Sequence, residues 1–326
     1  MQRRINDELV NDDSWSVALS VVRGVHIPPA LSQLLRGCQG GVVAPEDLLR
    51  VIGSKGLSPR SIVRAAQISD HTSPVSTKEI MAAVDILGVK ASSIILAINC
   101  VCEQILSSGP ALRLWAPMFK EMMSEIELGY HVGSSVEQLG IEQGMLVGFS
   151  RLAGVGVLLK SSPDSYEEWH ARTSFVLNPT ETLEAFGCEP YQVSSLLMQQ
   201  LGLGIEVALA TASTLGQIDS TIIESKPLFA TWRATSDWIG ALRSGAWEPE
   251  SSASRELFWQ LSTVPGAPLL PSHISALRDQ ATAIRSGNSQ WTWHLPLSTY
   301  EETAKAMVYK RNNNPFGASW SRSLEA

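Results

Sequence analysis

The chain has 326 residues, of which 44% are hydrophobic and 17% are charged, and its net charge is −7. This length leaves room for one large domain or two smaller ones, and the apolar content excludes a wholly disordered chain. The acidic balance argues against a broad nucleic-acid surface, because such a surface needs concentrated Lys and Arg.

We expect neither a signal peptide nor a membrane-spanning helix. The longest strongly apolar run, residues 94–101, is interrupted by Asn99 and falls well short of the ~18 apolar residues that span a bilayer. The N-terminus has no apolar core behind its two arginines. The four cysteines show no disulfide-framework spacing. These features predict a cytoplasmic protein in a reducing compartment, with no membrane partner.

Helix start and stop signals recur along the first half of the chain. Pro45 is followed by two carboxylates, a pattern typical of a helix start, and Gly53 is expected to end that helix. Residues 76–79 have the pattern of a capping box, and Gly88 is expected to end the helix that they begin. Residues 92–103 predict a helix that is buried on nearly all sides.

The second half continues with helical patterns. Long helices are predicted over residues 114–139 and 144–159, and shorter ones after Asn178 and over residues 193–203 and 205–215. The second long segment contains four glycines, which predict close packing against other helices: Gly144, Gly148, Gly154 and Gly156. No convincing run of alternating β-branched residues is present. The predicted fold class is all-α.

Tryptophan is concentrated near the C-terminus, where seven of the ten lie in the last 95 residues. Pro, Ser and Gly are frequent in residues 248–254 and 264–272, which places a loose boundary near residues 235–250. We expect a short helical extension with a small core beyond it, ending in a mobile tail. An exposed recognition surface built from these tryptophans is the alternative.

Four segments, taken in order, resemble the HDOD family (HD-related output domain) of bacterial signalling proteins. Residues 27–31 (IPPAL) are similar to its opening segment, and residues 48–67 are similar to its "DPALTARLLRLAN" helix pair. Residues 83–88 (AVDILG) resemble its "AI..LG" helix end. Residues 184–203 resemble its "E..FG.DH.EVG…WGLP" stretch. The resemblance covers about 190 residues.

The resemblance implies a multi-helix HDOD/HD-like bundle with a short Trp-rich helical extension. The expected organisation is a helical lead-in (1–22), an HDOD domain (23–240) made of an N-terminal helical subdomain (23–110) and a pseudo-HD subdomain (111–240), and a C-terminal accessory segment (241–326).

The metal ligands of HD phosphohydrolases are missing from the matching positions. Arg151 and Leu152 stand where the family's "GLLHDIG" motif has His-Asp, and Glu189-Pro190 replaces Asp-His. Ala212-Ser213 stands where related sequences often have His-His. A cation and an aliphatic side chain cannot ligate a divalent ion. We therefore expect no metal, no cofactor and no catalytic residue.

Three residues are candidates for a relic HD pocket: Arg151, Glu189 and His131. An arginine within an apolar stretch needs a carboxylate, helix-end carbonyls or an anionic ligand. Glu189 is the predicted partner of Arg151, provided that the degenerate site keeps the family geometry. His131 lies in the helix that precedes the pseudo-HD segment, where an ordinary packed position is the simpler interpretation.

The function that these observations predict is a non-catalytic signalling or regulatory scaffold. It would contact a protein partner and could bind a nucleotide-like small ligand in the relic pocket. One alternative is a metal-dependent phosphohydrolase with a displaced site, for example His131 with Asp164 or His170. The other is a DNA-binding regulator that uses residues 46–67 as a helix–turn–helix with Arg60 and Arg64 on the second helix.

Overall fold

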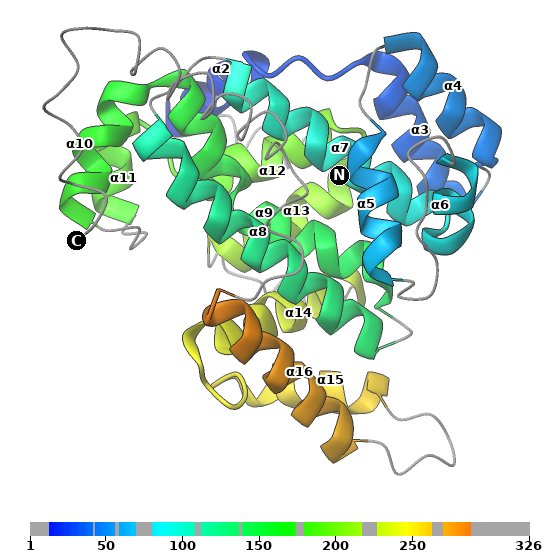
Figure 1. Cartoon of the computed structure of the whole chain (residues 1–326). Coiled ribbons are helices and arrows are strands. Elements are labelled where there is room, and N and C mark those ends of the chain that lie inside the picture. Colours follow the sequence, from blue (N-terminus) through cyan, green and yellow to red (C-terminus); the bar gives the residue numbers. More distant parts are fainter. Residues whose placement is uncertain are drawn as a thin grey trace, which may run out of the picture.

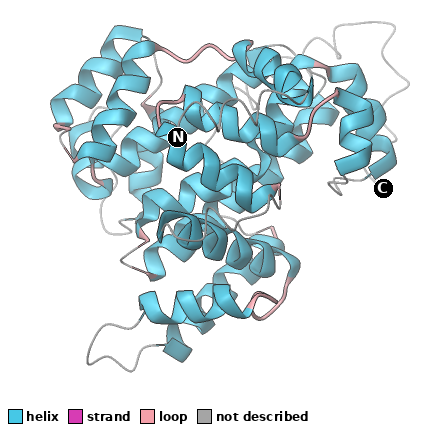
Figure 2. Cartoon of the chain, turned by 180° about the vertical axis from the view of Figure 1, so that it is seen from behind, coloured by secondary structure: helices cyan, strands magenta, loops and turns pink. Residues whose placement is uncertain are grey.

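The computed structural model describes residues 13–41, 43–55, 59–69, 80–107, 112–136, 139–173, 179–216, 227–262 and 270–287. Within these ranges the chain forms fifteen α-helices and no strand (Figures 1 and 2). The predicted all-α class is therefore confirmed.

The N-terminal lobe consists of helices that gather on one side of the molecule and pack on the long helix α7 (Figure 1). Its helices are α3 (Pro29–Gly40), α4 (Pro45–Lys55), α5 (Arg60–Ser69) and α6 (Ile80–Leu87). The preceding helix α2 (Asp13–Arg23) packs instead on α9 and α12. Pro45 begins α4 as predicted, although the helix continues two residues beyond Gly53. Gly88, with φ 81°, follows the last residue of α6. The predicted capping box lies outside the described residues.

The centre of the molecule is built around α9, which contacts helices on several sides. The central helices are α7 (Val89–Ser107), α8 (Leu112–Ser135), α9 (Gly140–Ser161), α12 (Pro190–Gln200) and α13 (Gly204–Leu215). Helices α10 (Pro163–Thr173) and α11 (Pro179–Phe186) lie at one side, and α14 (Pro227–Ser244), α15 (Ser252–Ser262) and α16 (Leu270–Arg285) lie below (Figure 1).

Glycines allow α8 and α9 to approach backbone to backbone. A Cβ atom on Gly129 of α8 would overlap the carbonyl oxygen of Gly144 on α9. One turn further along α9, a Cβ on Gly148 would overlap the carbonyl oxygen of Glu125. On another side of α9, a Cβ on Gly154 would overlap the carbonyl oxygen at the start of α12. The close packing predicted from these glycines is confirmed.

Two central helices are apolar over a greater length than the sequence analysis expected. Val89–Leu106 of α7 and Gly140–Ser161 of α9 are long and apolar enough to cross a membrane by length and composition alone. A count of uninterrupted apolar runs does not detect such segments, because Ser, Gly and Asn occur among their apolar residues. Most of each window is buried inside the bundle, 72% for α7 and 83% for α9. Burial of this extent is that of core helices.

In the C-terminal helices and the loop between them, some tryptophans are buried and one is exposed. Trp232 and Trp238 of α14 are buried, and the Trp238 ring lies 4.5 Å from the ring of Phe258 on α15. This contact joins α15 to the hydrophobic core that α14 shares with the central helices, so the separate small core expected for the extension is not formed. Trp247, between the two helices, is 71% exposed. Trp291, Trp293 and Trp320 lie outside the described residues. Helix α14 runs unbroken through residue 240, where the sequence placed a domain end.

Candidate functional site

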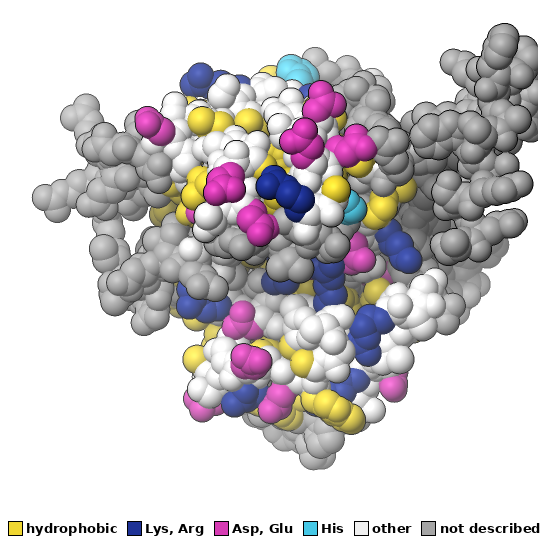
Figure 3. Space-filling model, turned by 90° about the vertical axis from the view of Figure 1, so that its left-hand side faces the viewer, with side chains coloured by type: hydrophobic (Ala, Val, Ile, Leu, Met, Phe, Trp, Pro, Cys, Tyr) yellow, Lys and Arg dark blue, Asp and Glu magenta, His cyan; other side chains and the backbone are white. Residues whose placement is uncertain are grey.

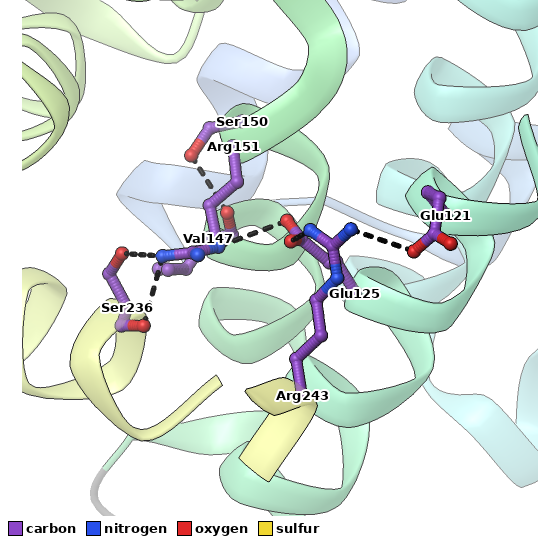
Figure 4. A network of polar contacts seen from close by, with 7 residues as sticks. All are labelled: Glu121, Glu125, Val147, Ser150, Arg151, Ser236 and Arg243. Atoms are coloured by element: carbon purple, nitrogen blue, oxygen red, sulfur yellow. Dashed lines mark hydrogen bonds and ion pairs between the residues drawn. The ribbon is translucent and has the colours of Figure 1, made fainter. Parts of the chain in front are cut away.

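Arg151, which stands at the matching position of the HD histidine, lies on α9 and points between α8 and α14 (Figure 4). Its Nε donates a hydrogen bond to Glu125 Oε2 at 3.0 Å. Its Nη1 donates to the Ser236 carbonyl oxygen at 3.1 Å and to Ser236 Oγ at 2.7 Å. Gly240 of α14 leaves room for the guanidinium, since a Cβ there would lie 3.3 Å from Nη2. Arg151 is thus paired inside the protein.

Glu125 of α8 is the centre of this network. Its side chain is 1% exposed, and it accepts hydrogen bonds from both Arg151 and Arg243 of α14. Arg243 also contacts Glu121, with Nη2 2.8 Å from Oε2. Burial lowers the pKa of Arg243, but the Glu125 and Glu121 carboxylates together outweigh burial and raise it. Arg243 therefore stays charged, and the network joins α8, α9 and α14 through ionic hydrogen bonds.

A pocket of about 260 Å³ adjoins the network. Its lining includes Arg151 and Leu152 from α9, Thr214 from α13, and Asp237 from α14. The Thr214 hydroxyl is buried and has no hydrogen-bond partner among the described residues. The pocket thus brings Arg151 and Leu152, from the middle of α9, next to Thr214 and Leu215 at the end of α13, whereas Ala212 and Ser213 are not part of its lining.

The residues in this pocket do not fit the divalent metal of an HD enzyme. Glu125 is already held by two guanidinium groups, and Asp237 accepts a hydrogen bond from Ser254 Oγ at 2.5 Å. A cation placed beside them would meet the positive charge of Arg151. Across the ranges that the structure describes, no group of three or more His, Cys, Asp or Glu side chains is arranged to hold a metal ion.

The predicted pairing of Arg151 with Glu189 is wrong. Glu189 is the N-cap residue of α12, and its backbone N–H donates to Gln192 Oε1 at 2.8 Å. The part of α9 that meets the start of α12 is Gly154, whereas Arg151 is directed toward α8 and α14. The sequence placed Glu189 correctly at a helix start but could not show which side of α9 that start would cover.

His131 does not join the Arg151 network. It lies on α8, where its Nε2 is 4.0 Å from Glu127 Oε1 and its ring stands edge-on to Tyr130. Burial lowers the pKa of His131 to about 4, and the neighbouring Glu127 does not offset that effect. His131 is therefore neutral at pH 7, a packed helix residue.

The displaced metal site is not assembled either. Asp164 is exposed near the start of α10, and His170 stacks on Tyr166 at a centroid distance of 5.8 Å. The ion-pair and ring contacts of His131 are with Glu127 and Tyr130, and among the described residues it belongs to no group of metal-ligating side chains with Asp164 or His170.

The helix–turn–helix interpretation meets a different obstacle. Helix α4 packs on α3 and α7, whereas α5 packs mainly on α6. A helix–turn–helix needs its two helices to pack on each other so that the second is presented to a groove. The side chains of Arg60 and Arg64 lie outside what the structure describes.

Sequence reasoning missed Glu125 and Arg243. Glu125 and Glu127 were visible as carboxylates within a strongly apolar helix, which is a signal of a buried polar contact. Arg243 carried no comparable signal, because it lies 118 residues from Glu125 in the chain.

No protein-family profile matches the chain, and no curated protein matches it. Two solved structures do. An HDOD domain protein of unknown function from Geobacter sulfurreducens has a TM-score of 0.58 at 14% identity, over 84% of this chain and 97% of its own. A candidate phosphohydrolase from Shewanella amazonensis SB2B has a TM-score of 0.57 at 13% identity, over 86% and 98%. The resemblance found in the sequence is confirmed at the level of architecture: this chain has the HDOD fold.

Proposed function

We propose that this protein is a non-catalytic regulatory module of the HDOD type that acts through contacts with a partner protein. The observation that carries the proposal is the Arg151–Glu125–Arg243 network. It fills the position of an HD metal centre with a guanidinium group and uses the nearest buried carboxylate to hold two arginines. In this arrangement the relic site fixes α14 against α8 and α9.

The charge balance of the pocket supports a structural role over a nucleotide site. Arg151 and Arg243 are offset by Glu121, Glu125 and Asp237, so phosphate would meet a surplus of carboxylates. At about 260 Å³ the pocket is also below the range of roughly 300–1,000 Å³ that is usual for small-molecule sites. The proposal therefore rests on protein contacts.

One exposed aromatic residue supports a protein-binding role. The Arg278 guanidinium lies 4.0 Å from the centre of the Trp247 ring, and Nε and Nη2 of the same arginine donate to the Trp247 carbonyl oxygen. An exposed tryptophan that is held in place loses little conformational entropy when a partner covers it, as interface anchors require.

The face formed by α10 and α11 does not support the alternative of a nucleic-acid-binding protein. Acidic side chains gather on the upper part of that face (Figure 3). Helix α10 carries Asp164, Glu167 and Glu168, and α11 carries Glu181 and Glu184. Such a face repels phosphate.

The test is a combined metal and hydrolysis measurement on the purified full chain. Bound Mn, Fe, Zn and Mg would be quantified by mass spectrometry, and hydrolysis of bis-p-nitrophenyl phosphate would be followed with each metal added. We expect substoichiometric metal and no hydrolysis above the metal-only blank. Stoichiometric metal together with turnover that is lost in Glu125→Gln would overturn the proposal and establish a hydrolase.

A further inference from the structure

A second cavity, far larger than the relic pocket, lies where the N-terminal lobe meets the central helices. Its volume is about 760 Å³. Helices α3, α7, α9, α13 and α14 all contribute to its lining. The apolar part of that lining includes Leu35, Ile94, Leu146, Leu203, Leu228 and Trp232. Cavities of this size and character, at a junction between two lobes, are typical small-molecule sites.

Local backbone features maintain the cavity. Gly140 and Gly204 begin α9 and α13, and both have positive φ angles, 73° and 84°. Left-handed backbone of this kind turns the chain sharply at the cavity edge and strains any other residue type. Gln39 of α3 donates from Nε2 to the Leu203 carbonyl oxygen, which ties the N-terminal lobe to the start of α13. The junction is thus bridged at one edge.

Two charged groups at this cavity differ from those at the relic pocket, because they have no ionic partner in the part of the chain that the structure describes. Lys90 of α7 and Glu142 of α9 both line it, and neither forms an ion pair or hydrogen bond with another described side chain. Glu142 is half-buried in the first turn of α9, where the helix dipole favours a carboxylate. Glu206 of α13 also belongs to the lining, but it is exposed, whereas Glu142 is partly buried in the cavity wall.

We propose that this inter-lobe cavity binds a small organic cation with an apolar body, whose charged group pairs with Glu142. The apolar lining would take the body of the ligand, and Glu142, which is partly buried while Lys90 is exposed, would pair with a positive charge at the cavity wall. The proposal is independent of the non-catalytic role, since it uses none of the residues of the relic pocket.

Cys38 is a natural reporter for the cavity. It belongs to the lining and is 6% exposed, whereas Cys100, Cys102 and Cys188 are 3%, 0% and 0% exposed. Burial raises the pKa of its thiol, and the charges of Lys90 and Glu142 act on it with opposite signs. Because a thiol with a raised pKa reacts slowly at neutral pH, alkylation would be measured near pH 8.5.

The experiment compares three probes with the same apolar body: 4-phenylbutylamine, 4-phenylbutanol and 4-phenylbutyrate. Binding to the full chain would be titrated by saturation-transfer NMR, and alkylation of each cysteine by iodoacetamide would be followed by peptide mass spectrometry. We expect the amine to bind roughly fivefold more tightly than the alcohol, with the acid weakest, as one half-exposed charge pair allows. We also expect the amine to slow alkylation of Cys38 at least about twofold.

Two variants assign the interaction. Glu142→Gln should remove the preference for the amine over the alcohol, while Glu184→Gln, on the exposed face of α11, should leave it intact. Ile205→Trp, at a half-exposed lining position, should weaken binding of all three probes. Equal binding of the three probes by the unaltered chain would overturn the predicted ligand class. Unchanged alkylation of Cys38 with the amine at saturation would overturn the site itself and needs no variant to fold.

Discussion

The two cavities of this molecule share helices α9, α13 and α14 but have opposite character. The relic pocket is small, and each of its two arginines is paired with a carboxylate of the same chain. The inter-lobe cavity is about three times larger, is lined largely by aliphatic side chains, and contains Lys90 and Glu142, neither of which has an ionic partner among the described residues. The difference indicates that the charged groups around Arg151 belong to the framework of the protein, whereas the junction of the two lobes has space for a ligand.

The physical reason lies in how each site satisfies its charges. The carboxylate of Glu125 is 1% exposed and must be paired, and Arg151 and Arg243 pair with it, which joins α8, α9 and α14. Of the charged groups that line the inter-lobe cavity, Lys90 and Glu206 are exposed and Glu142 is partly exposed, so water can solvate them until a ligand arrives. The charges of the relic pocket therefore cannot be rearranged without leaving a buried carboxylate unpaired, whereas the charges of the inter-lobe cavity can take a new partner.

The largest effect is expected where α8 and α9 touch, because α9 lines both cavities. We expect Gly148→Ala to lower the free energy of unfolding by about 3 kcal/mol, because its Cβ would overlap the Glu125 carbonyl oxygen. Denaturant unfolding checks this. Gly53→Ala on α4 is the matched control: its Cβ meets no atom within 4 Å, so it should be neutral or raise stability by up to about 1 kcal/mol. Similar effects of the two variants would contradict the close-packing argument.

A smaller effect is expected when the network loses its centre. Glu125→Ala leaves Arg151 and Arg243 without their shared carboxylate, and we expect a loss of about 2–3 kcal/mol in the free energy of unfolding. Hydrogen exchange should also show α14 opening more readily than α7. Glu46→Ala, at an exposed position on α4, provides the comparison. A change in stability no larger than that of Glu46→Ala would show that the network is not structural.

The pH dependence of stability tests the packing of His131 on α8, the helix that also carries Glu125. His131 is neutral in the folded protein down to about pH 4, whereas the unfolded chain binds its proton near pH 6.5. The unfolded state therefore holds more protons between these values, and this residue's contribution to stability is lost as the pH falls from about 6.5 to 4. We expect His131→Phe to reduce the loss on acidification by about 2 kcal/mol. If the free energy of unfolding fell by the same amount between pH 7 and pH 4.5 in the unaltered chain and in the variant, the assignment of His131 as neutral would be contradicted.

The smallest change should follow when the whole network is replaced by apolar groups. The triple variant Glu125→Leu, Arg151→Met and Arg243→Met removes the charges together, and we expect it to unfold within about 1 kcal/mol of the unaltered chain. It would thereby differ from Glu125→Ala alone, since no buried charge is left unpaired. A loss as large as that of the single variant would mean that the network supplies net stability rather than balanced charges.

The sequence by itself determined the local features of this protein. Pro45 begins a helix because its missing N–H is not needed there, and Gly88 follows a helix end because it accepts a positive φ. The glycines of α9 predicted close packing because nothing else explains their number in an apolar helix. Arg151 and Leu152 ruled out an HD ligand pair at their positions through side-chain chemistry alone.

Only the tertiary structure decided which groups meet. The partners of Arg151 lie 26 and 85 residues away, and the chosen carboxylate was Glu125 rather than Glu189. An ion pair depends on which side of a helix faces its neighbour, and that follows from the crossing of α8, α9 and α14 around their glycines. The inter-lobe cavity was invisible for the same reason, since its lining comes from five helices that are brought together only by folding.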